Sequence, residues 1–335
     1  MTALAGFGRA GGAMAASLLV AGVLMLLAGH DPVAAYAAMA RGVFGSPDRV
    51  AVALNRATPY LLAGSGVALC FRAGLANIGA EGQIALGGLA ATAAALLAPG
   101  CLPGPAIPGA ALLAAAAAGA AWSALAGVLR VWRGVHEVLS TLLLNFVAAL
   151  LVAEALHGAL GEDGSGFPQS PMLDPAAWLP PLVPGLELHA GAPAALLAAA
   201  VLQAVLWRTV PGFQWRLLGF SPGAARYAGV PVARATVAVM AVGGALAGIA
   251  GGVEVLGVHQ RLIEGFSAGF GFAAVAIALV AAAEPLAVVP AAAFFAALET
   301  GSQAMQRATG VPSSLVLVIQ GLTLLFVLAG LGRRA

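Results

Sequence analysis

Three polar side chains interrupt an otherwise apolar stretch, AGLANIGAEGQIALGG, at residues 73 to 88. They are two amides and a carboxylate, Asn77, Gln83 and Glu81. A charged side chain near the centre of a bilayer costs on the order of 3 kcal/mol, so it must be paired, protonated or in contact with water. Amide side chains at such a place can satisfy backbone groups that a broken helix leaves free. The stretch predicts either a hydrogen-bonded plug at a helix break or the lining of a polar path.

A second polar group lies in VHEVLSTLLLN, at residues 135 to 145. Glu137, Ser140, Thr141 and Asn145 in this stretch are three or four residues apart, so they fall near one face of a helix. A third candidate, Glu254, lies in GGVEVLGVHQRLIEG and fits a salt bridge to an arginine at the rim as well as a place in the path. The candidates for the translocation path or a subunit interface are therefore Asn77, Glu81, Gln83, Glu137, Ser140, Thr141, Asn145 and Glu254.

Motifs of soluble enzymes are absent from the sequence. There is no Gly-rich loop ending in Gly-Lys-Ser/Thr, no pair of His and Cys at metal-binding spacing, and no Gly-x-Ser-x-Gly elbow. His136 and Glu137, the nearest catalytic pair, are adjacent and point to different helix faces. We expect no catalytic residues, no metal and no cofactor on this chain, so energy for uphill transport must come from an ion gradient or a partner ATPase.

The elements that carry these side chains are predicted to be membrane helices. Of the 335 residues, 61% are hydrophobic and 8% are charged, against about 25% charged residues in soluble domains. Ten apolar runs are bounded by proline, glycine or charge. They are residues 13–28, 59–71, 84–97, 107–129, 138–156, 192–207, 235–258, 270–283, 286–298 and 315–331.

The predicted fold is an all-α polytopic membrane protein in one permease domain, residues 1–335, with about ten transmembrane helices and eight at the fewest. The ninth run is short and follows Glu284-Pro285, which leaves a re-entrant segment as an alternative. The small net charge of +2 does not favour nucleic acid as a partner.

The arginines predict the orientation. If the N-terminus is cytoplasmic and each apolar run crosses the membrane once, ten arginines lie on the cytoplasmic side and five on the outer side. Because cytoplasmic loops carry more arginine, both termini are expected in the cytoplasm. The inner ten are Arg9, Arg72, Arg130, Arg133, Arg208, Arg216, Arg226, Arg234, Arg333 and Arg334.

Two long loops lie on opposite sides in this topology. The outer loop, residues 157–191, is rich in proline and glycine and is expected to be an irregular cap. The inner loop, residues 208–234, is predicted to contain one short helix. This helix starts at Ser221-Pro222 and is ended by Gly229 and Pro231.

Small residues recur every four positions in GGALAGIAGG. Gly244, Gly248 and Gly252 share one helical face and would let another helix approach closely. Packing within the bundle is the favoured interpretation, and a subunit interface is the alternative.

Five segments together resemble the permease subunits of bacterial ABC importers: FRAGLANIGAEGQIALGG, VHEVLSTLLLNFVA, RLLGFSPGAARYAGV, GALAGIAGGVEVLGV and GVPSSLVLVIQGLTLLFVLA. They cover the chain in order from about residue 55 to residue 331. The resemblance is to the branch with ribose-type and branched-chain amino acid permeases. Within it, the run from Asn77 to Gln83 is most similar to permeases of nucleoside importers that work with basic-membrane-protein lipoproteins.

The resemblance implies a binding-protein-dependent importer in the bacterial cytoplasmic (inner) membrane, working by ATP-driven alternating access. The implied partners are ABC ATPase subunits that bind ATP and Mg, a second and shorter paralogous permease, and an extracytoplasmic substrate-binding lipoprotein. A nucleoside is the implied substrate and a simple sugar such as ribose is the alternative. A lone ion-coupled carrier is a further alternative, which the arginine-rich inner loop disfavours.

In that family the segment matched by Gly219 to Gly229 is the coupling helix, which docks on the ATPase. Arg226 would then offer planar hydrogen bonds to the ATPase, although a role in topology alone is the alternative. Carried over residue by residue, the docking set is Gly219, Ser221, Pro222, Ala224, Ala225, Arg226, Tyr227 and Gly229.

Overall fold

The computed structural model describes residues 2–98, 101–267 and 269–331 of the chain. Within these ranges the protein is helical and forms no β-strand, only two isolated β-bridges. The helices of the first half are α1 (Thr2–Leu27), α2 (Pro32–Phe44), α3 (Pro47–Arg72), α4 (Ala80–Leu97), η1 (Gly104–Ala106), α5 (Ile107–Arg133) and α6 (Glu137–His157). Those of the second half are η2 (Pro175–Ala177), α7 (Gly191–Arg208), α8 (Val210–Phe220), α9 (Pro222–Tyr227), α10 (Val232–Glu254), η3 (Val255–His259), α11 (Phe270–Val280), α12 (Pro285–Thr309) and α13 (Leu315–Leu331).

Each predicted apolar run coincides with a helix, although run 13–28 extends one residue beyond α1 and run 270–283 extends three residues beyond α11. Among the described residues, six helical segments are long and apolar enough to cross a bilayer: α4, η1 with α5, α6, α7, α10 with η3, and α12. Apolar segments of α1, α11 and α13 are shorter. The chain is thus a helical, multi-pass membrane protein, and the count of ten spans stays a prediction.

Three features differ from the expectation. The helix expected from residue 59 begins at Pro47, α2 lies between the first two predicted spans, and the inner loop contains α8 as well as α9. Each of these helices starts with a polar cap followed by proline, at Ser46-Pro47, at Asp31-Pro32 and at Thr209 with Pro211. They were missed because α2 and α8 are too short to span and because charges lower the hydropathy of the first half of α3.

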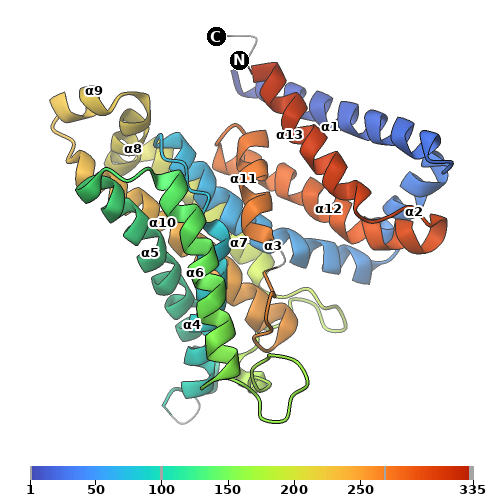
Figure 1. Ribbon diagram of the computed structural model, residues 1–335, viewed down its shortest axis with the longest axis horizontal. Coiled ribbons are helices and arrows are strands. Elements are labelled where there is room, and N and C mark those ends of the chain that lie inside the picture. Colours follow the sequence, from blue (N-terminus) through green and yellow to red (C-terminus); the bar gives the residue numbers. More distant parts are fainter. Residues whose placement is uncertain (1, 99–100, 268, 332–335) are drawn as a thin grey trace.

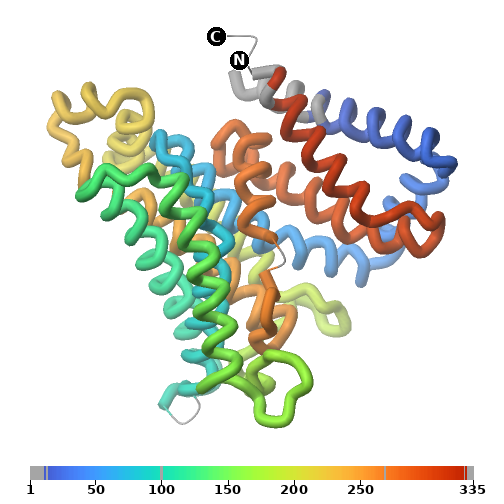
Figure 2. The backbone as a smooth tube through the Cα atoms, viewed as in Figure 1, coloured from blue at the N-terminus to red at the C-terminus, as the bar shows by residue number. Residues whose placement is uncertain are grey.

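Two groups of helices diverge in Figure 1. α4, α5, α6 and α10 pack together on one side, α1, α2, α12 and α13 on the other, and α3 contacts both groups. Figure 2 shows α1 and α13 side by side, where Ser17 and Thr323 share a hydrogen bond of 2.7 Å.

Glycines let the helices of the first group approach closely. A Cβ on Gly244 would lie 2.3 Å from the carbonyl oxygen of Gly119, and one on Gly248 would lie 2.2 Å from that of Ala115. Gly252 also faces Ala115 and Leu112 of α5. The predicted packing of this glycine face within the bundle is confirmed.

α10 connects the two ends of the molecule. Its N-terminal end follows α9, and its C-terminal end continues into η3, where the 157–191 loop is fixed by backbone hydrogen bonds from Leu179 to Leu256 and from Leu173 to Gln260. In Figure 1 this loop lies at the bottom, far from α8 and α9 at the upper left. The inner arginines Arg333 and Arg334 lie outside the described residues.

Candidate functional site

The chain leaves the helical conformation between α3 and α4, over residues 73–79. Gly74 has a φ of +72°, a left-handed conformation that favours glycine. Two amides close this segment: Asn77 Nδ2 donates to Gln83 Oε1 at 3.1 Å, and Gln83 Nε2 donates to Asn77 Oδ1 at 3.0 Å. Asn77 Oδ1 also accepts from the backbone N–H of Gly79 at 3.0 Å. Both amide side chains are 1% exposed, so these bonds are shielded from water.

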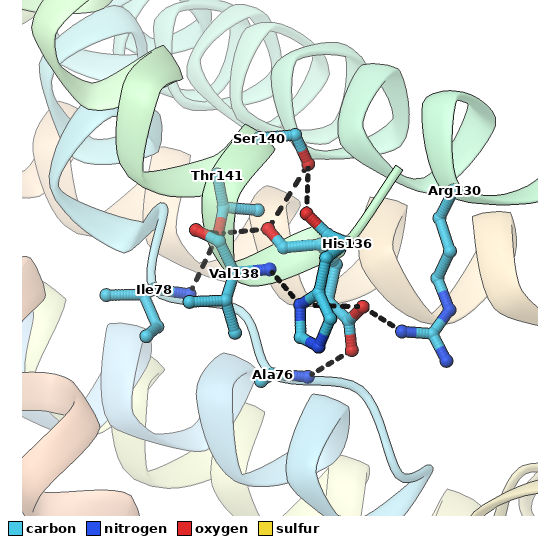
Figure 3. Close-up of polar contacts among 8 residues, drawn as sticks. Ala76, Ile78, Arg130, His136, Val138, Ser140 and Thr141 are labelled. Carbon is cyan, nitrogen blue, oxygen red and sulfur yellow. Dashed lines mark hydrogen bonds and ion pairs between the residues drawn. The ribbon is translucent and has the colours of Figure 1, made fainter. Parts of the chain in front are cut away.

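α6 supplies the other partners of the break. Asn145 accepts from the N–H of Gly82 and donates to the carbonyl oxygen of Ile78, both at 2.9 Å. The hydroxyl of Thr141 accepts from the N–H of Ile78 at 3.3 Å and donates to the carbonyl of Glu137 at 2.7 Å (Figure 3). The side chain of Asn145 thus satisfies two backbone groups of the break that would otherwise lack partners.

Glu137 holds the start of the break. Its carboxylate accepts a hydrogen bond from the N–H of Ala76 at 3.3 Å and forms an ion pair with Arg130, which lies in the last turn of α5 (Figure 3). Glu137 is 4% exposed, and the guanidinium of Arg130 balances its charge. Ser140 contacts only backbone carbonyls of its own helix, those of His136 and Glu137.

The structure therefore brings six candidates together: Asn77, Gln83, Glu137, Ser140, Thr141 and Asn145. The hydrogen-bonded plug predicted for residues 73–88 is confirmed for Asn77 and Gln83. The side chains of α6 join it in the structure, and we call the six residues the break cluster. It contains no nucleophile paired with a base, so its chemistry is that of a scaffold.

Glu81 does not join the break cluster. Its carboxylate instead accepts from the hydroxyl of Ser267 at 2.5 Å and from the backbone N–H groups of Gly269 and Gly271 at 3.2 and 2.7 Å. These N–H groups are free at the N-terminus of α11, where the helix dipole favours a negative charge. The expectation that Glu81 helps to hold its own segment is wrong, because its side chain caps another helix.

Glu254 belongs to a separate group, which we call the charge cluster: Arg56, Tyr60, Glu254, His259 and Glu299. Arg56 forms an ion pair with Glu299 and lies 3.9 Å from Glu254. Tyr60 donates its hydroxyl hydrogen to Glu299. His259 Nε2 is 3.5 Å from Glu254 Oε1. The arginine beside Glu254 is thus Arg56, while Arg261 pairs with Glu162.

Sequence reasoning missed Arg56, Tyr60 and His259 as members of a site. The predicted span of residues 59–71 leaves Arg56 in an outer segment. In the structure Pro59 lies inside α3, which therefore includes Arg56. The cap signal Ser46-Pro47 with Asp48 would have moved the helix start and placed Arg56 within the helix.

α9 follows the predicted helix closely. Ser221 caps it by accepting from the N–H of Ala224, Ala225 is buried, and Arg226 and Tyr227 are exposed, Tyr227 to 97%. A cleft of about 760 Å³ lies between α9, the turn after α3 and the start of α10, lined among others by Gly74, Arg130, Arg226 and Arg234.

A direct backbone contact joins this end to the break. A Cβ on Gly219, at the end of α8, would lie 2.2 Å from the carbonyl oxygen of Arg72 and 2.9 Å from the N of Gly74. Because packed backbones cannot slide past one another freely, a shift of α8 and α9 must act on the turn that opens the break.

Comparison with known proteins gives a consistent set of relatives. Residues 50–328 match the family described as "Branched-chain amino acid transport system / permease component". The glucose ABC transporter permease protein TsgB13 of Haloferax volcanii is 38% identical over 323 residues, 93% of this chain and 84% of that protein. The guanosine ABC transporter permease protein NupP of Bacillus subtilis is 32% identical over 92% of this chain and 89% of that protein. The nucleoside ABC transporter permease protein NupB of Lactococcus lactis is 26% identical over 92% and 87%.

Proposed function

This chain belongs to the family of branched-chain amino acid transport system permease components, and on that premise we propose that it is the membrane-spanning subunit of an ABC importer for nucleosides. Permeases of this family act with an ATPase and a substrate-binding protein. A nucleoside substrate is supported by the similarity along nearly the whole chain to a guanosine permease and a nucleoside permease. The segment from Asn77 to Gln83 supports the same substrate.

A sugar is the second candidate substrate, because the glucose permease of Haloferax volcanii has the higher identity, 38%. Glucose and the nucleosides share one chemical feature, a ring that carries neighbouring hydroxyl groups. Either substrate would therefore present the same kind of polar group to the permease.

The finer topology is part of the proposal. The apolar runs and the arginine bias support ten membrane-spanning helices and both termini in the cytoplasm. The family supports a place in the bacterial inner membrane. A second, paralogous permease would complete the channel, and a lipoprotein would deliver substrate from outside. ATP and Mg would be bound by the partner ATPase.

In the proposed mechanism α9 is the coupling helix. The predicted coupling segment comprises Gly219, Ser221, Pro222, Ala224, Ala225, Arg226, Tyr227 and Gly229. Arg226 and Tyr227 are exposed for contact with the ATPase, whereas Ala225 is buried and Gly219 packs against the turn after α3. Closure of the ATPase would move α8 and α9, and the contact of Gly219 with Arg72 and Gly74 would pass this movement to the break. From there Glu81 links α4 to α11, so these two helices would shift together and change access from one side to the other.

The path candidates take two roles in this proposal. The break cluster would hold the segment between α3 and α4 in shape while it moves. Glu81 contacts the start of α11, and Glu254 lies beside Arg56, which stacks over Phe270 at that start. This is where we place the path. Half-helices that end inside the membrane commonly mark the substrate route in transporters.

Uptake measurements test the proposal. Radiolabelled adenosine, guanosine, uridine, ribose and glucose are offered to cells that express this chain with its partner genes, with an active or an ATPase-dead motor subunit. Nucleoside uptake that requires the active motor supports the proposal. Uptake of sugar alone would contradict the substrate, and uptake that ignores the motor and follows a proton gradient would contradict the ATP-driven mechanism.

A further inference from the structure

The charge cluster lies in the membrane-spanning part of the protein, toward the end at which Asn55 of α3 is hydrogen-bonded to Glu187 and His189 of the 157–191 loop. Two ion pairs join α3 to α12, Arg72 with Glu284 and Arg56 with Glu299. Sixteen residues separate the two arginines in α3, which corresponds to about 24 Å at about 1.5 Å per residue. The hydrocarbon layer is about 30 Å thick. With Arg72 at one boundary, Arg56 and its partners lie within this layer.

Three members of the cluster are open on one side. The side chains of Arg56, His259 and Glu299 are 30%, 29% and 28% exposed. Charged groups at membrane depth face water-filled cavities or other proteins rather than lipid. The exposed parts of the cluster therefore face water or the second permease of the proposed channel.

The two carboxylates differ in how well they are bonded. Glu299 is satisfied, since it pairs with Arg56 and accepts from the hydroxyl of Tyr60. Glu254 is 1% exposed, and its contacts to Arg56 and His259, at 3.9 and 3.5 Å, are longer than ordinary hydrogen bonds. Its second oxygen, Oε2, is buried and has no hydrogen-bond partner among the described residues. A buried carboxylate oxygen without a partner is unfavourable unless something donates to it.

The guanidinium of Arg56 is fixed in place. It stacks over the ring of Phe270 at 4.7 Å from the ring centroid, and Tyr60 meets the same ring edge-on at 5.1 Å. Phe270 is the first residue of α11, whose free N–H groups at Gly269 and Gly271 are already bound by Glu81. The start of this helix is thus no site for an anion, although helix N-termini usually attract one.

From these contacts we propose that the charge cluster binds neighbouring hydroxyl groups of a neutral sugar or ribose ring, with Glu254 accepting the hydroxyl hydrogens. The inference rests on the proposed function and names the part of the substrate that the permease itself recognises. A diol would exchange the two long contacts of Glu254 for hydrogen bonds, and Arg56 would donate to the hydroxyl oxygens. The site is covered in this conformation, as a site in an alternating-access path must be in one of its states.

The charges set the substrate class. Two carboxylates, Glu254 and Glu299, face one arginine, Arg56. Next to it, Asn55 donates to the backbone carbonyl of Glu187 and accepts from the backbone N–H of His189. A phosphorylated sugar or a nucleotide would be repelled, whereas an uncharged polyol would not.

The test uses the complete importer in proteoliposomes, with the binding protein, the ATPase and both permeases. Adenosine is compared with 2′,3′-dideoxyadenosine, which lacks the hydroxyl pair. Calorimetry on the isolated binding protein fixes concentrations at which both nucleosides saturate it, and uptake is then expressed per ATP hydrolysed. We expect the native importer to favour adenosine by about tenfold, the effect of about one lost hydrogen bond to a charged group.

Glu254→Gln should slow the uptake of adenosine alone and so bring the ratio of adenosine to dideoxyadenosine uptake close to one. Glu254→Asp should keep the ratio of the native importer. Glu264→Gln, a change at an exposed glutamate, is the matched control and should leave the preference unchanged. Equal uptake of both nucleosides by the native importer would overturn the inference without any variant, as would equal slowing of both by Glu254→Gln. A native importer without ATP-dependent uptake of any nucleoside or sugar would refute the proposed function itself.

Discussion

The carboxylate of Glu81 on α4 accepts a hydrogen bond of 2.7 Å from the backbone N–H of Gly271 on α11. The two chains touch so closely here that a Cβ on Gly271 would lie 2.0 Å from the N of Glu81. Two helix N-termini thus meet at one negative charge, which both dipoles favour. This contact joins the segment after the break to the half-helix beside the charge cluster.

Glu81→Gln removes the charge and keeps the shape. Hydrogen bonds to charged groups contribute about 1.5–3 kcal/mol, so we expect at least about a tenfold loss of ATP-driven uptake and a lower melting temperature in detergent. Glu264→Gln again serves as the control. Native uptake by the Glu81→Gln permease, with unchanged melting, would show that the charge at α11 is dispensable.

Arg226→Glu tests the coupling helix. We expect it to abolish uptake without loss of membrane insertion, because a reversed charge at an exposed docking residue blocks contact with the ATPase. Arg133→Glu is the matched control, since Arg133 is also an exposed arginine in the last turn of a helix at the same end of the molecule. Co-purification of the ATPase with each variant is measured beside uptake. Normal uptake by Arg226→Glu would remove the docking role of α9.

Sequence patterns predicted the long apolar helices but not α2, α8 or the start of α3. Apolar runs found ten helices because hydropathy reports burial in lipid or protein directly. α2, α8 and the first turns of α3 were lost because their signals are local caps, such as Ser46-Pro47, rather than long apolar runs. Helices that carry charge or lie outside the spans need these cap signals.

The site divides in the same way. The members of the break cluster could be predicted, because they lie in two short polar segments and those of α6 share a helix face at three- and four-residue spacing. That the two segments bond to each other was not predicted. The charge cluster could not be predicted, since Arg56, Glu254 and Glu299 come from three helices far apart in the sequence. Their meeting depends on how α3 crosses α10 and α12, which periodicity does not encode.

Asn145→Ala probes the break cluster. The change leaves the N–H of Gly82 and the carbonyl of Ile78 without partners inside the protein. At about 1–3 kcal/mol for each unsatisfied group, the free energy of unfolding should fall by about 2–6 kcal/mol. Leu143→Ala, at an exposed position of the same helix, should have a much smaller effect. Thermal melting in detergent measures both, and equal melting temperatures would contradict the role of Asn145.

His189 gives the loop at residues 157–191 a dependence on pH. Its ring is 3% exposed, and burial lowers the pKa of His189 to about 4. Nδ1 accepts from the N–H of Gly191 at 3.1 Å, and a Cβ on Gly257 would touch the opposite edge of the ring. A proton on Nδ1 would break that hydrogen bond in a site with no room for water.

The direction of the pH effect follows from this lowered pKa. In the unfolded chain the imidazole titrates at its ordinary pKa of about 6.5, so between about pH 6.5 and pH 4 the unfolded state binds a proton that the folded state does not. The contribution of His189 to stability is therefore complete above about pH 6.5 and is lost as the pH falls, by about 2 kcal/mol at pH 5.

His189→Asn removes the titrating ring and keeps an acceptor for the N–H of Gly191. Melting curves of both proteins between pH 7.5 and 5 should converge as the pH falls, because only the native protein loses the contribution of His189. His157→Asn, a change at an exposed histidine of the same loop, is the control and should leave the pH profile of the native protein unaltered. Parallel profiles for the native protein and His189→Asn would show that His189 takes up a proton without strain in the folded state.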